Sequence, residues 1–210
     1  TGALASKFRN SGQTCVCANR ILVHAPVYDE FAERLGKAVA ALHSAPGTEP
    51  RATIGPLINP AAVEKVACHV DDALAKGARG LASGSGRSDG NFVHAVVLAG
   101  ATPDMLVAEE ETFGPVAPLF RFGDEDEAIA MANATPFGLA SYFYTRDLAR
   151  SFRVAERLEA GMVVLNTGSI AMEMAPFGGI KQSGIGREGG EAGIAEYLES
   201  KTFHIGGLES

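Results

Sequence analysis

Short apolar segments alternate with amphipathic segments of helical period along this chain, and this alternation restricts the fold more than any other feature. Residues 20–24 and 162–166 are apolar runs of strand length. In the segment 31–42, apolar residues recur as they do on one face of a helix. Strands that alternate with helices favour a parallel sheet with helices on its faces. We therefore expect an α/β domain of three layers with a largely parallel sheet.

Capping signals predict where several helices begin and end. Asn59, directly before Pro60, is typical of a helix start. Gly77 is typical of the left-handed residue that follows a helix. Asp124 and Asp147 are two further N-cap candidates, each in front of a helical pattern. These signals predict helices that start at about residues 60, 125 and 148.

A proline lies inside one of the strand candidates. Residues 116–122 are apolar and of strand length, but Pro118 lacks the backbone N–H that a sheet ladder needs. Proline is therefore confined to sheet edges, strand starts and bulges. We expect this strand at the edge of the sheet or at a bulge.

Composition excludes several classes of protein. The chain has 210 residues, 46% of them hydrophobic and 20% charged, with a formal net charge of -7. Such a chain can bury a sizeable core in one large domain, or in one domain with an appendage. The acidic balance disfavours a nucleic-acid partner. No apolar run approaches the roughly 18 residues of a membrane helix, and the first residues do not resemble a signal peptide. We expect a cytoplasmic protein without a membrane or nucleic-acid partner.

Three cysteines, Cys15, Cys17 and Cys68, form neither an even disulfide framework nor the paired spacing of a zinc site. We expect a reducing compartment and no metal. Cys68 lies beside apolar positions of a predicted helix, which favours a place in the core. Cys15 lies among small polar residues, between Arg9 and Arg20. Positive charge favours a nucleophilic thiolate, whereas a free cysteine is more often a small apolar filler.

Several motifs resemble those of one enzyme family. Residues 8–20 are similar to the nucleophile segment of the aldehyde dehydrogenase superfamily, and most similar to its branch that oxidises succinic semialdehyde. Residues 110–115 resemble the Glu-x-Phe-Gly-Pro signature of the family, and residues 137–140 and Asn166 match steps that follow it. Residues 176–188 resemble its C-terminal signature. The motifs follow in the family's order along essentially the whole chain.

The resemblance implies a role for three residues in chemistry and cofactor binding. Cys15 is the expected nucleophile, whose thiolate adds to an aldehyde and whose own backbone N–H helps to bind the oxyanion. The adduct, a thiohemiacetal, gives hydride to NAD or NADP, and water hydrolyses the resulting thioester. Glu111 is expected to bind the ribose beside the nicotinamide, and Phe113 to pack against the same part of the cofactor. Without the family, Glu111 is a solvated acid and Phe113 a core residue.

The resemblance also implies contacts for the far end of the substrate. Arg9, six positions before Cys15, matches an arginine that binds a distal carboxylate in the succinic semialdehyde branch. The alternative is a surface arginine paired with an acid. That branch often has a serine before Pro-Phe-Gly-Gly as a second contact. Ala171 stands at its position here, and Ser169 is the residue that can substitute. The expected substrate is a small aldehyde with a distal carboxylate.

A second cysteine follows the predicted nucleophile closely. Some members of the branch carry the same Cys-x-Cys and resemble redox switches, in which a reversible disulfide blocks the nucleophile. The ring closed by Cys15 and Cys17 is tight and therefore easily reduced, which suits regulation. An inert buried thiol at Cys17 is the alternative interpretation.

The resemblance divides the chain into three parts. Residues 1–183 are expected to form the catalytic domain, residues 184–200 a helical segment that returns toward the cofactor domain, and residues 201–210 an oligomerisation strand. The short strand expected at residues 202–205 has no local partner, which favours pairing with another copy in a homo-oligomer, a dimer or a tetramer.

The family's dinucleotide-binding domain precedes its cysteine segment, together with a general-base glutamate and an asparagine of the oxyanion hole. No part of this sequence resembles them. We therefore expect the catalytic part of a longer chain, with little dehydrogenase activity alone. The residues that distinguish NAD from NADP also lie upstream in the family. Two alternatives stay open: a cofactor-independent esterase that uses Cys15, and a catalytically silent oligomerisation domain.

Overall fold

The computed structural model describes residues 1–170 and 172–207, and its main sheet has four strands. Their order is β1 (Ile21–His24), β6 (Val116–Phe122), β5 (Val96–Ala99) and β3 (Arg79–Ser83). The first three strands are parallel and β3 is antiparallel to β5. A second, parallel pair is formed by β8 (Ala140–Phe143) and β9 (Met162–Leu165). The predicted α/β architecture with a mostly parallel sheet is confirmed, although the strands form separate sheets.

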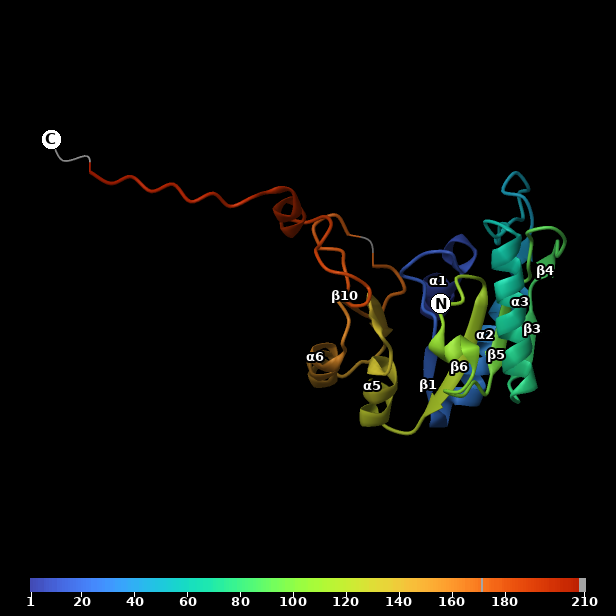
Figure 1. Ribbon diagram of the computed structural model, residues 1–210. Helices are drawn as coiled ribbons and strands as arrows, with labels where there is room; N and C mark the ends of the chain where they lie inside the picture. Colours follow the sequence, from blue (N-terminus) through green and yellow to red (C-terminus); the bar gives the residue numbers. More distant parts are fainter. Residues whose placement is uncertain (171, 208–210) are drawn as a thin grey trace.

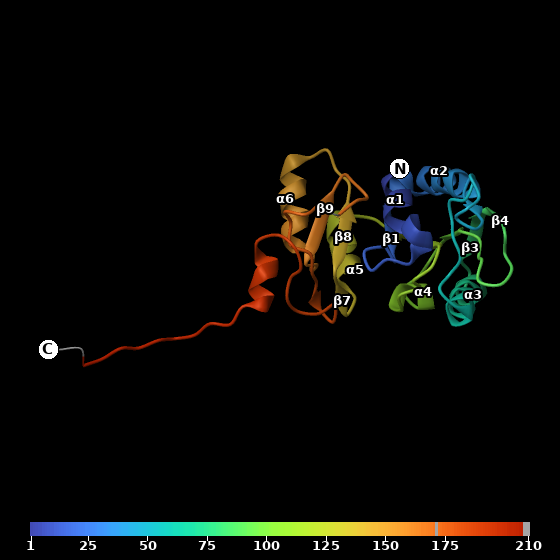
Figure 2. The ribbon, with the colours of Figure 1, turned by 90° about the horizontal axis from the view of Figure 1, so that it is seen from above.

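Helices cover both faces of the main sheet, as Figure 2 shows from above. One face packs against α1 (Gly2–Phe8) and α2 (Tyr28–Ala40), and the other against α3 (Pro60–Ala75) and α4 (Leu106–Glu109). Side chains alternate along a strand, so Val97 belongs to the α2 cluster and Leu98 to the α3 cluster. Both are fully buried. Full burial of one such side chain contributes about 2 kcal/mol.

The part of the chain that follows β6 lies beside this three-layer part (Figure 1). It contains α5 (Glu125–Asn133) and α6 (Leu148–Arg157) with the β8–β9 pair, and an antiparallel pair of β7 (Phe137–Gly138) and β10 (Ile180–Lys181). The remaining elements are β2 (His43–Ser44), β4 (Ser85–Gly86) and the 3-10 helices η1 (Arg9–Gly12), η2 (Ala25–Val27) and η3 (Ala192–Tyr197). The Arg20 guanidinium, next to β1, joins the three-layer part to α5, because it donates to the carbonyl oxygens of Met131 and Ala132 at 2.6 and 2.8 Å.

The predicted helix starts are confirmed by side-chain caps. The Asn59 carboxamide oxygen accepts from the Ala62 N–H at 2.9 Å. Asp124 and Asp147 accept in the same way from the third residue of α5 and of α6. Gly77 follows α3 with a φ of +98°, as a left-handed residue. These ends are encoded locally, because each cap satisfies an N–H that the helix itself leaves free.

The expected position of Pro118 at a sheet edge or a bulge is wrong, because β6 is a central strand and its register with β5 is continuous. β6 lies between β1 and β5, and Pro118 is paired with Leu98 of β5. The ladder to β1 begins one residue later, with Leu119 opposite Ile21. Since β6 has no ladder partner on that side at Pro118, a missing N–H directed there removes no sheet hydrogen bond.

The predicted core position of Cys68 is also wrong. Cys68 is exposed, while Val66, His69 and Ala73 are the buried residues of α3. Those three positions follow one another at helical spacing and turn the neighbouring Cys68 toward solvent. The apolar neighbours of Cys68 therefore belong to a different stripe of the helix.

The C-terminal segment leaves the body of the molecule, as the red end of the ribbon in Figure 1 shows. Residues 198–207 follow η3 without regular secondary structure, and Phe203 is 80% exposed. Within the described residues this segment has no strand partner, so an oligomerisation strand at 201–210 stays a prediction, and its last three residues lie outside the described part. No helix of the described residues is both long and apolar enough to cross a membrane.

Candidate functional site

Cys15 follows a segment whose backbone is unusual. Asn10, Ser11 and Gly12 have φ values of 47°, 59° and 76°, all in the left-handed region. Only glycine adopts this region without cost, and other residues lose of the order of 1–3 kcal/mol each. A β-carbon on Gly12 would also lie 2.1 Å from the Gly114 carbonyl oxygen. This cysteine turn, residues 9–17, therefore needs contacts from outside that hold its shape.

The connector before α3 supplies two of these contacts. The Ser11 hydroxyl donates to the Gly55 carbonyl at 3.0 Å and accepts from the Gly55 N–H at 2.9 Å. The Gln13 carboxamide oxygen accepts from the Ile58 N–H at 2.9 Å. Both side chains bind backbone groups of residues 55–58, so this connector acts as a template for the cysteine turn.

A third contact comes from the second half of the chain. The Tyr142 hydroxyl on β8 donates to the Val16 carbonyl at 3.0 Å. Burial raises the pKa of Tyr142 to about 12, against the opposing effect of the nearby Arg9 guanidinium. Tyr142 therefore remains a protonated donor, and it fixes the backbone directly after Cys15.

The two thiols of the turn have different surroundings. Cys15 is exposed, whereas Cys17 is partly buried, and both are free. The Cys17 sulfur lies 2.8 Å from the Thr14 hydroxyl and 3.6 Å from the Arg9 carbonyl, to which it donates. Cys15 is thus presented to an incoming molecule, while Cys17 is held by the turn.

A buried cation lies next to this turn and was not singled out from the sequence. Lys7 is 1% exposed, and burial lowers its pKa to about 8. The negative charge of Glu111 opposes that shift, so the ammonium lies near this carboxylate. Three consecutive residues of α1, Ser6, Lys7 and Phe8, are buried. A run of this kind has no helical period, which is why pattern analysis did not find Lys7.

The cofactor-side motif predicted at residues 110–115 touches the cysteine turn. Glu111 is exposed and Phe113 is 38% exposed, with a φ of 49°. Gly114, which follows Phe113, is buried. It packs against Gly12 of the cysteine turn and against Val66 of α3. The structure thus places an exposed carboxylate and an exposed aromatic ring beside the turn that carries Cys15.

The two residues predicted for the substrate tail also lie close together. The Arg9 guanidinium donates to the Gly168 carbonyl at 3.4 Å, and Ser169 is the next residue along the chain. Both side chains are exposed. Ala171, at the position of the family's serine, lies outside the described residues. A cation and a hydroxyl next to the cysteine turn can bind an anion.

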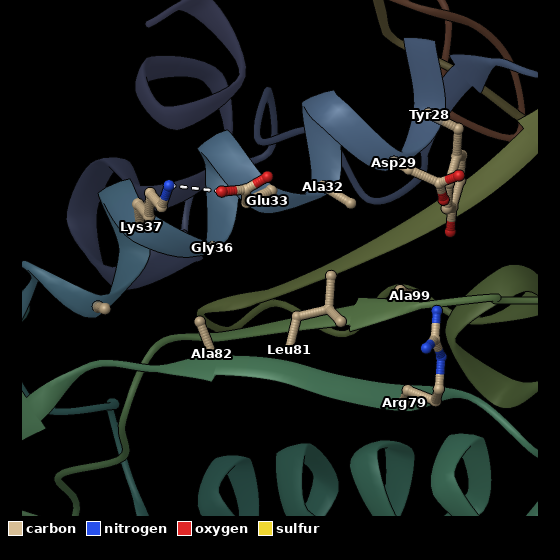
Figure 3. A pocket seen from close by; sticks show the side chains of 11 residues that line it. Tyr28, Asp29, Ala32, Glu33, Gly36, Lys37, Arg79, Leu81, Ala82 and Ala99 are labelled. Carbon is tan, nitrogen blue, oxygen red and sulfur yellow. Dashed lines mark hydrogen bonds and ion pairs between the residues drawn. The ribbon is translucent and has the colours of Figure 1, made fainter. Parts of the chain in front are cut away.

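Other features of the surface do not belong to this site. A groove of about 450 Å³ lies between α2 and the edge strand β3, with Leu81 and Ala82 on its floor (Figure 3). Its rim carries the Glu33–Lys37 ion pair, and none of its residues belongs to the cysteine turn or the cofactor-side motif. Within residues 1–170 and 172–207, no group of three or more potential ligands could hold a metal ion.

The fold and the site define an α/β domain organised around one exposed cysteine, with a glutamate, an aromatic residue and an arginine beside it. The sequence profile of the Aldehyde dehydrogenase family matches residues 1–203 of the chain. The chain belongs to this family, as its motifs predicted.

Known proteins agree with this assignment. The chain is 58% identical over 206 residues to the succinate-semialdehyde dehydrogenase [NADP(+)] GabD of Escherichia coli, covering 98% of the chain and 43% of that protein. It is 60% identical over 204 residues to the glutarate-semialdehyde dehydrogenase of Pseudomonas putida, covering 97% and 42%. The crystal structure of succinate-semialdehyde dehydrogenase from Burkholderia pseudomallei superposes with a TM-score of 0.91 at 58% identity, covering 93% and 41%. The chain therefore spans about two fifths of the length of the proteins that it matches.

Proposed function

We propose that the protein to which this chain belongs oxidises a small aldehyde with a distal carboxylate, succinic semialdehyde in the first place, with NAD or NADP as oxidant. The observation that carries the proposal is the exposed Cys15, on a turn in contact with the motif that presents Glu111 and Phe113. Relatives named for succinate and glutarate semialdehydes support the substrate class.

Cys15 is the proposed nucleophile. Its sulfur bonds to the aldehyde carbon, and the carbonyl oxygen becomes an alkoxide that the Cys15 N–H can bind. Loss of hydride from the same carbon leaves a thioester, and water then cleaves the carbon–sulfur bond to release a carboxylate and the thiol. The fixed backbone around Cys15 holds its N–H and its Cα–Cβ bond in one orientation, and a preorganised site of this kind lowers a barrier.

The exposed pair Glu111 and Phe113 fits a nicotinamide nucleotide. A carboxylate accepts hydrogen bonds from ribose hydroxyls, and an aromatic ring covers an apolar part of the cofactor. When bound, the oxidised nicotinamide accepts the hydride. Glu111 and Phe113 orient it, and the left-handed backbone of Phe113 directs the ring outward.

Arg9 is proposed to bind the distal carboxylate of the substrate, with Ser169 as a second donor. A guanidinium can donate two parallel hydrogen bonds to a carboxylate. In the structure, Arg9 already lies against the backbone of residue 168. Because its position is fixed by this contact, Arg9 would also set the distance between the distal carboxylate of the substrate and Cys15.

Cys17 is proposed as a redox partner of Cys15. Hydrogen peroxide removes one proton and one electron from each thiol, joins the two sulfurs and is itself reduced to water. The disulfide blocks the nucleophile until a dithiol reduces it. We expect peroxide to inactivate the enzyme reversibly, and the Cys17→Ser variant to resist reversible inactivation. Equal behaviour of the two proteins would favour an inert thiol.

Three further features of the whole protein are proposed. Residues 1–183 act as the catalytic domain, residues 184–200 return toward a cofactor domain, and residues 201–210 pair with another copy in a homo-oligomer. The protein works in the cytoplasm. The segment 1–210 alone lacks dehydrogenase activity, because its matched relatives are more than twice as long.

Rates of the full-length protein test the proposal. We expect reduction of NAD or NADP with succinic semialdehyde, and a loss on the order of 10⁴-fold in the Cys15→Ser variant. Arg9→Met should raise KM for succinic semialdehyde about 10- to 100-fold, since a charge-assisted hydrogen bond is lost. Butanal, which has no carboxylate, is the matched control, and its KM should not change. Activity that survives Cys15→Ser would contradict the role of Cys15 as nucleophile. Turnover by residues 1–210 alone would contradict the proposal that this segment is inactive by itself.

A further inference from the structure

We propose that His69 of α3 is a positioning residue that holds the cofactor-side motif, residues 110–115, in the shape that presents Glu111 and Phe113. This inference rests on the proposed function, because it assigns a role to His69 in cofactor binding. The side-chain hydrogen bonds of His69 go to Thr112 and Glu110. It acts through the two residues that flank Glu111.

The side chain of His69 is buried and bonded at both ring nitrogens. It is 2% exposed, although histidine is seldom so fully enclosed. Nδ1 lies 3.1 Å from the Thr112 hydroxyl, and Nε2 lies 3.3 Å from the Glu110 carboxylate. One ring therefore contacts the residue before Glu111 and the residue after it.

These partners assign the proton of the neutral ring. A carboxylate is only an acceptor, so Nε2 carries the proton and donates to Glu110. Nδ1 is then the acceptor, and the Thr112 hydroxyl donates to it. Burial lowers the pKa of His69 from 6.5, helped by the Lys65 ammonium and opposed by Glu110 and Asp72, so the neutral ring is the form present near pH 7.

The contact with Thr112 is the stronger restraint. Thr112 is buried, whereas the Glu110 side chain is 52% exposed and is also approached by Lys65. Water competes for the exposed carboxylate but not for the enclosed hydroxyl, and a buried hydrogen bond is costly to leave unmade. His69 therefore fixes the residue that directly precedes Phe113.

Asn19 holds the same motif from the opposite side. Its amide group donates to the Glu110 carbonyl at 2.9 Å, and its oxygen accepts from the Thr112 N–H at 3.0 Å. Asn19 binds the backbone of residues 110 and 112, and His69 binds the side chains of the same two residues. Since Asn19 also follows the cysteine turn closely, the two residues couple the motif to the nucleophile on one side and to α3 on the other.

The motif needs such restraints because its next residue is strained. Phe113 has a φ of 49°, and a non-glycine residue keeps this conformation only where its surroundings impose it. The following Gly114 is closely packed, because a β-carbon there would lie 2.4 Å from the Val66 side chain. Released from His69, the segment can relax toward an extended backbone and turn the Phe113 ring away from the cofactor.

Binding of NADH and NADPH to the full-length protein tests this role. The variants are His69→Leu, which removes both contacts, and Thr112→Val, which removes only the hydroxyl. We expect Kd to rise about tenfold in His69→Leu and about fivefold in Thr112→Val, as for the loss of one or two hydrogen bonds. The double variant should show no larger rise in Kd than His69→Leu alone, because the hydrogen bond that Thr112→Val removes is already lost in His69→Leu. KM for the cofactor should rise with kcat unchanged.

Conservative variants separate the two contacts. The amide of Asn in His69→Asn lies near the place of Nδ1 and can bind Thr112, while that of Gln in His69→Gln reaches toward Glu110. We expect His69→Asn to recover more of the cofactor affinity. Alkylation of Cys15 by iodoacetamide, which needs no cofactor, should stay within about twofold of the original rate in every variant, since the hydrogen bonds that hold the cysteine turn are kept in all of them.

Ala73→Gly is the control for a merely structural role, because Ala73 lies on the same buried face of α3 and outside the motif. It should lower Tm without changing Kd. The inference is overturned if Thr112→Val and His69→Leu bind the cofactor as well as the original protein, or if Ala73→Gly weakens binding equally. If His69→Leu does not fold, Thr112→Val decides. Failure of the original protein to oxidise any aldehyde would instead contradict the proposed function.

Discussion

The cysteine turn and the C-terminal region, which we define as residues 184–207, are both rich in left-handed backbone. They differ in what surrounds them. The turn is held by residues from the connector before α3, from β8 and from the cofactor-side motif. In the C-terminal region, Gly184 has a φ of +108°, and a β-carbon added there would meet no atom within 4 Å. Its neighbour Ile185 is fully exposed. The same backbone conformation is thus fixed by packing at Gly12 and only by the local residue at Gly184. Three pairs of substitutions test this contrast.

Replacement of glycine should show the largest difference. Gly12→Ala combines a positive φ with a β-carbon 2.1 Å from the Gly114 carbonyl oxygen, so we expect a loss of about 3–4 kcal/mol in unfolding free energy. Gly184→Ala meets no neighbour and should cost only the backbone term of about 1 kcal/mol. Urea unfolding of the two full-length variants gives both values. Equal losses would mean that the packing around the turn is unimportant.

Replacement of lysine should show a smaller, pH-dependent difference. The native pKa of Lys7, about 8, lies below its usual 10.5, so the unfolded chain binds the proton more strongly between these values. Stability should therefore rise with pH from about 8 to 10.5, by on the order of 3 kcal/mol. Lys7→Met removes this slope and should stabilise the protein most below pH 8.

The exposed Lys201 is the matched control for this experiment. Lys201→Met should leave the dependence of unfolding free energy on pH unchanged, because its ammonium is in water in both states. A slope that persists in Lys7→Met would show that another group is responsible.

Removal of one hydroxyl should show the smallest difference. Tyr142→Phe deletes the donor to the Val16 carbonyl, and we expect a loss of about 1 kcal/mol and a modest fall in kcat. Tyr197→Phe changes a residue that is 86% exposed, and should alter neither quantity measurably. Thermal unfolding and initial rates of the two variants decide the point. Identical behaviour would indicate that β8 does not help to fix the turn.

The same contrast explains which parts of the fold were predictable. The caps Asn59, Asp124 and Asp147 and the strand at residues 21–24 depend on neighbours in sequence, and all were found. Pro118 was misplaced because the length of β1, a strand nearly a hundred residues away, decides whether a missing N–H matters.

The site was predictable only in part for the same reason. Cys15, Glu111 and Arg9 were selected because their motifs resemble those of a family, and their roles stay predictions. Lys7 has no local signal, and the partners of both Lys7 and His69 include residues of distant segments. One signal for His69 was present: it follows Val66 by three positions and precedes Ala73 by four, which places it on a buried face.

Three of the outside partners of the cysteine turn are backbone groups, those of residues 55, 58 and 168, and the fourth is the Tyr142 hydroxyl. A backbone group persists when its side chain is replaced, so mutations at residues 55, 58 and 168 leave these three attachments in place. Evolution and protein engineering can therefore vary the residues that line the approach to Cys15, and with them the accepted aldehyde, without rebuilding the nucleophile. The cysteine turn can therefore stay the same while the residues around the approach to Cys15 change.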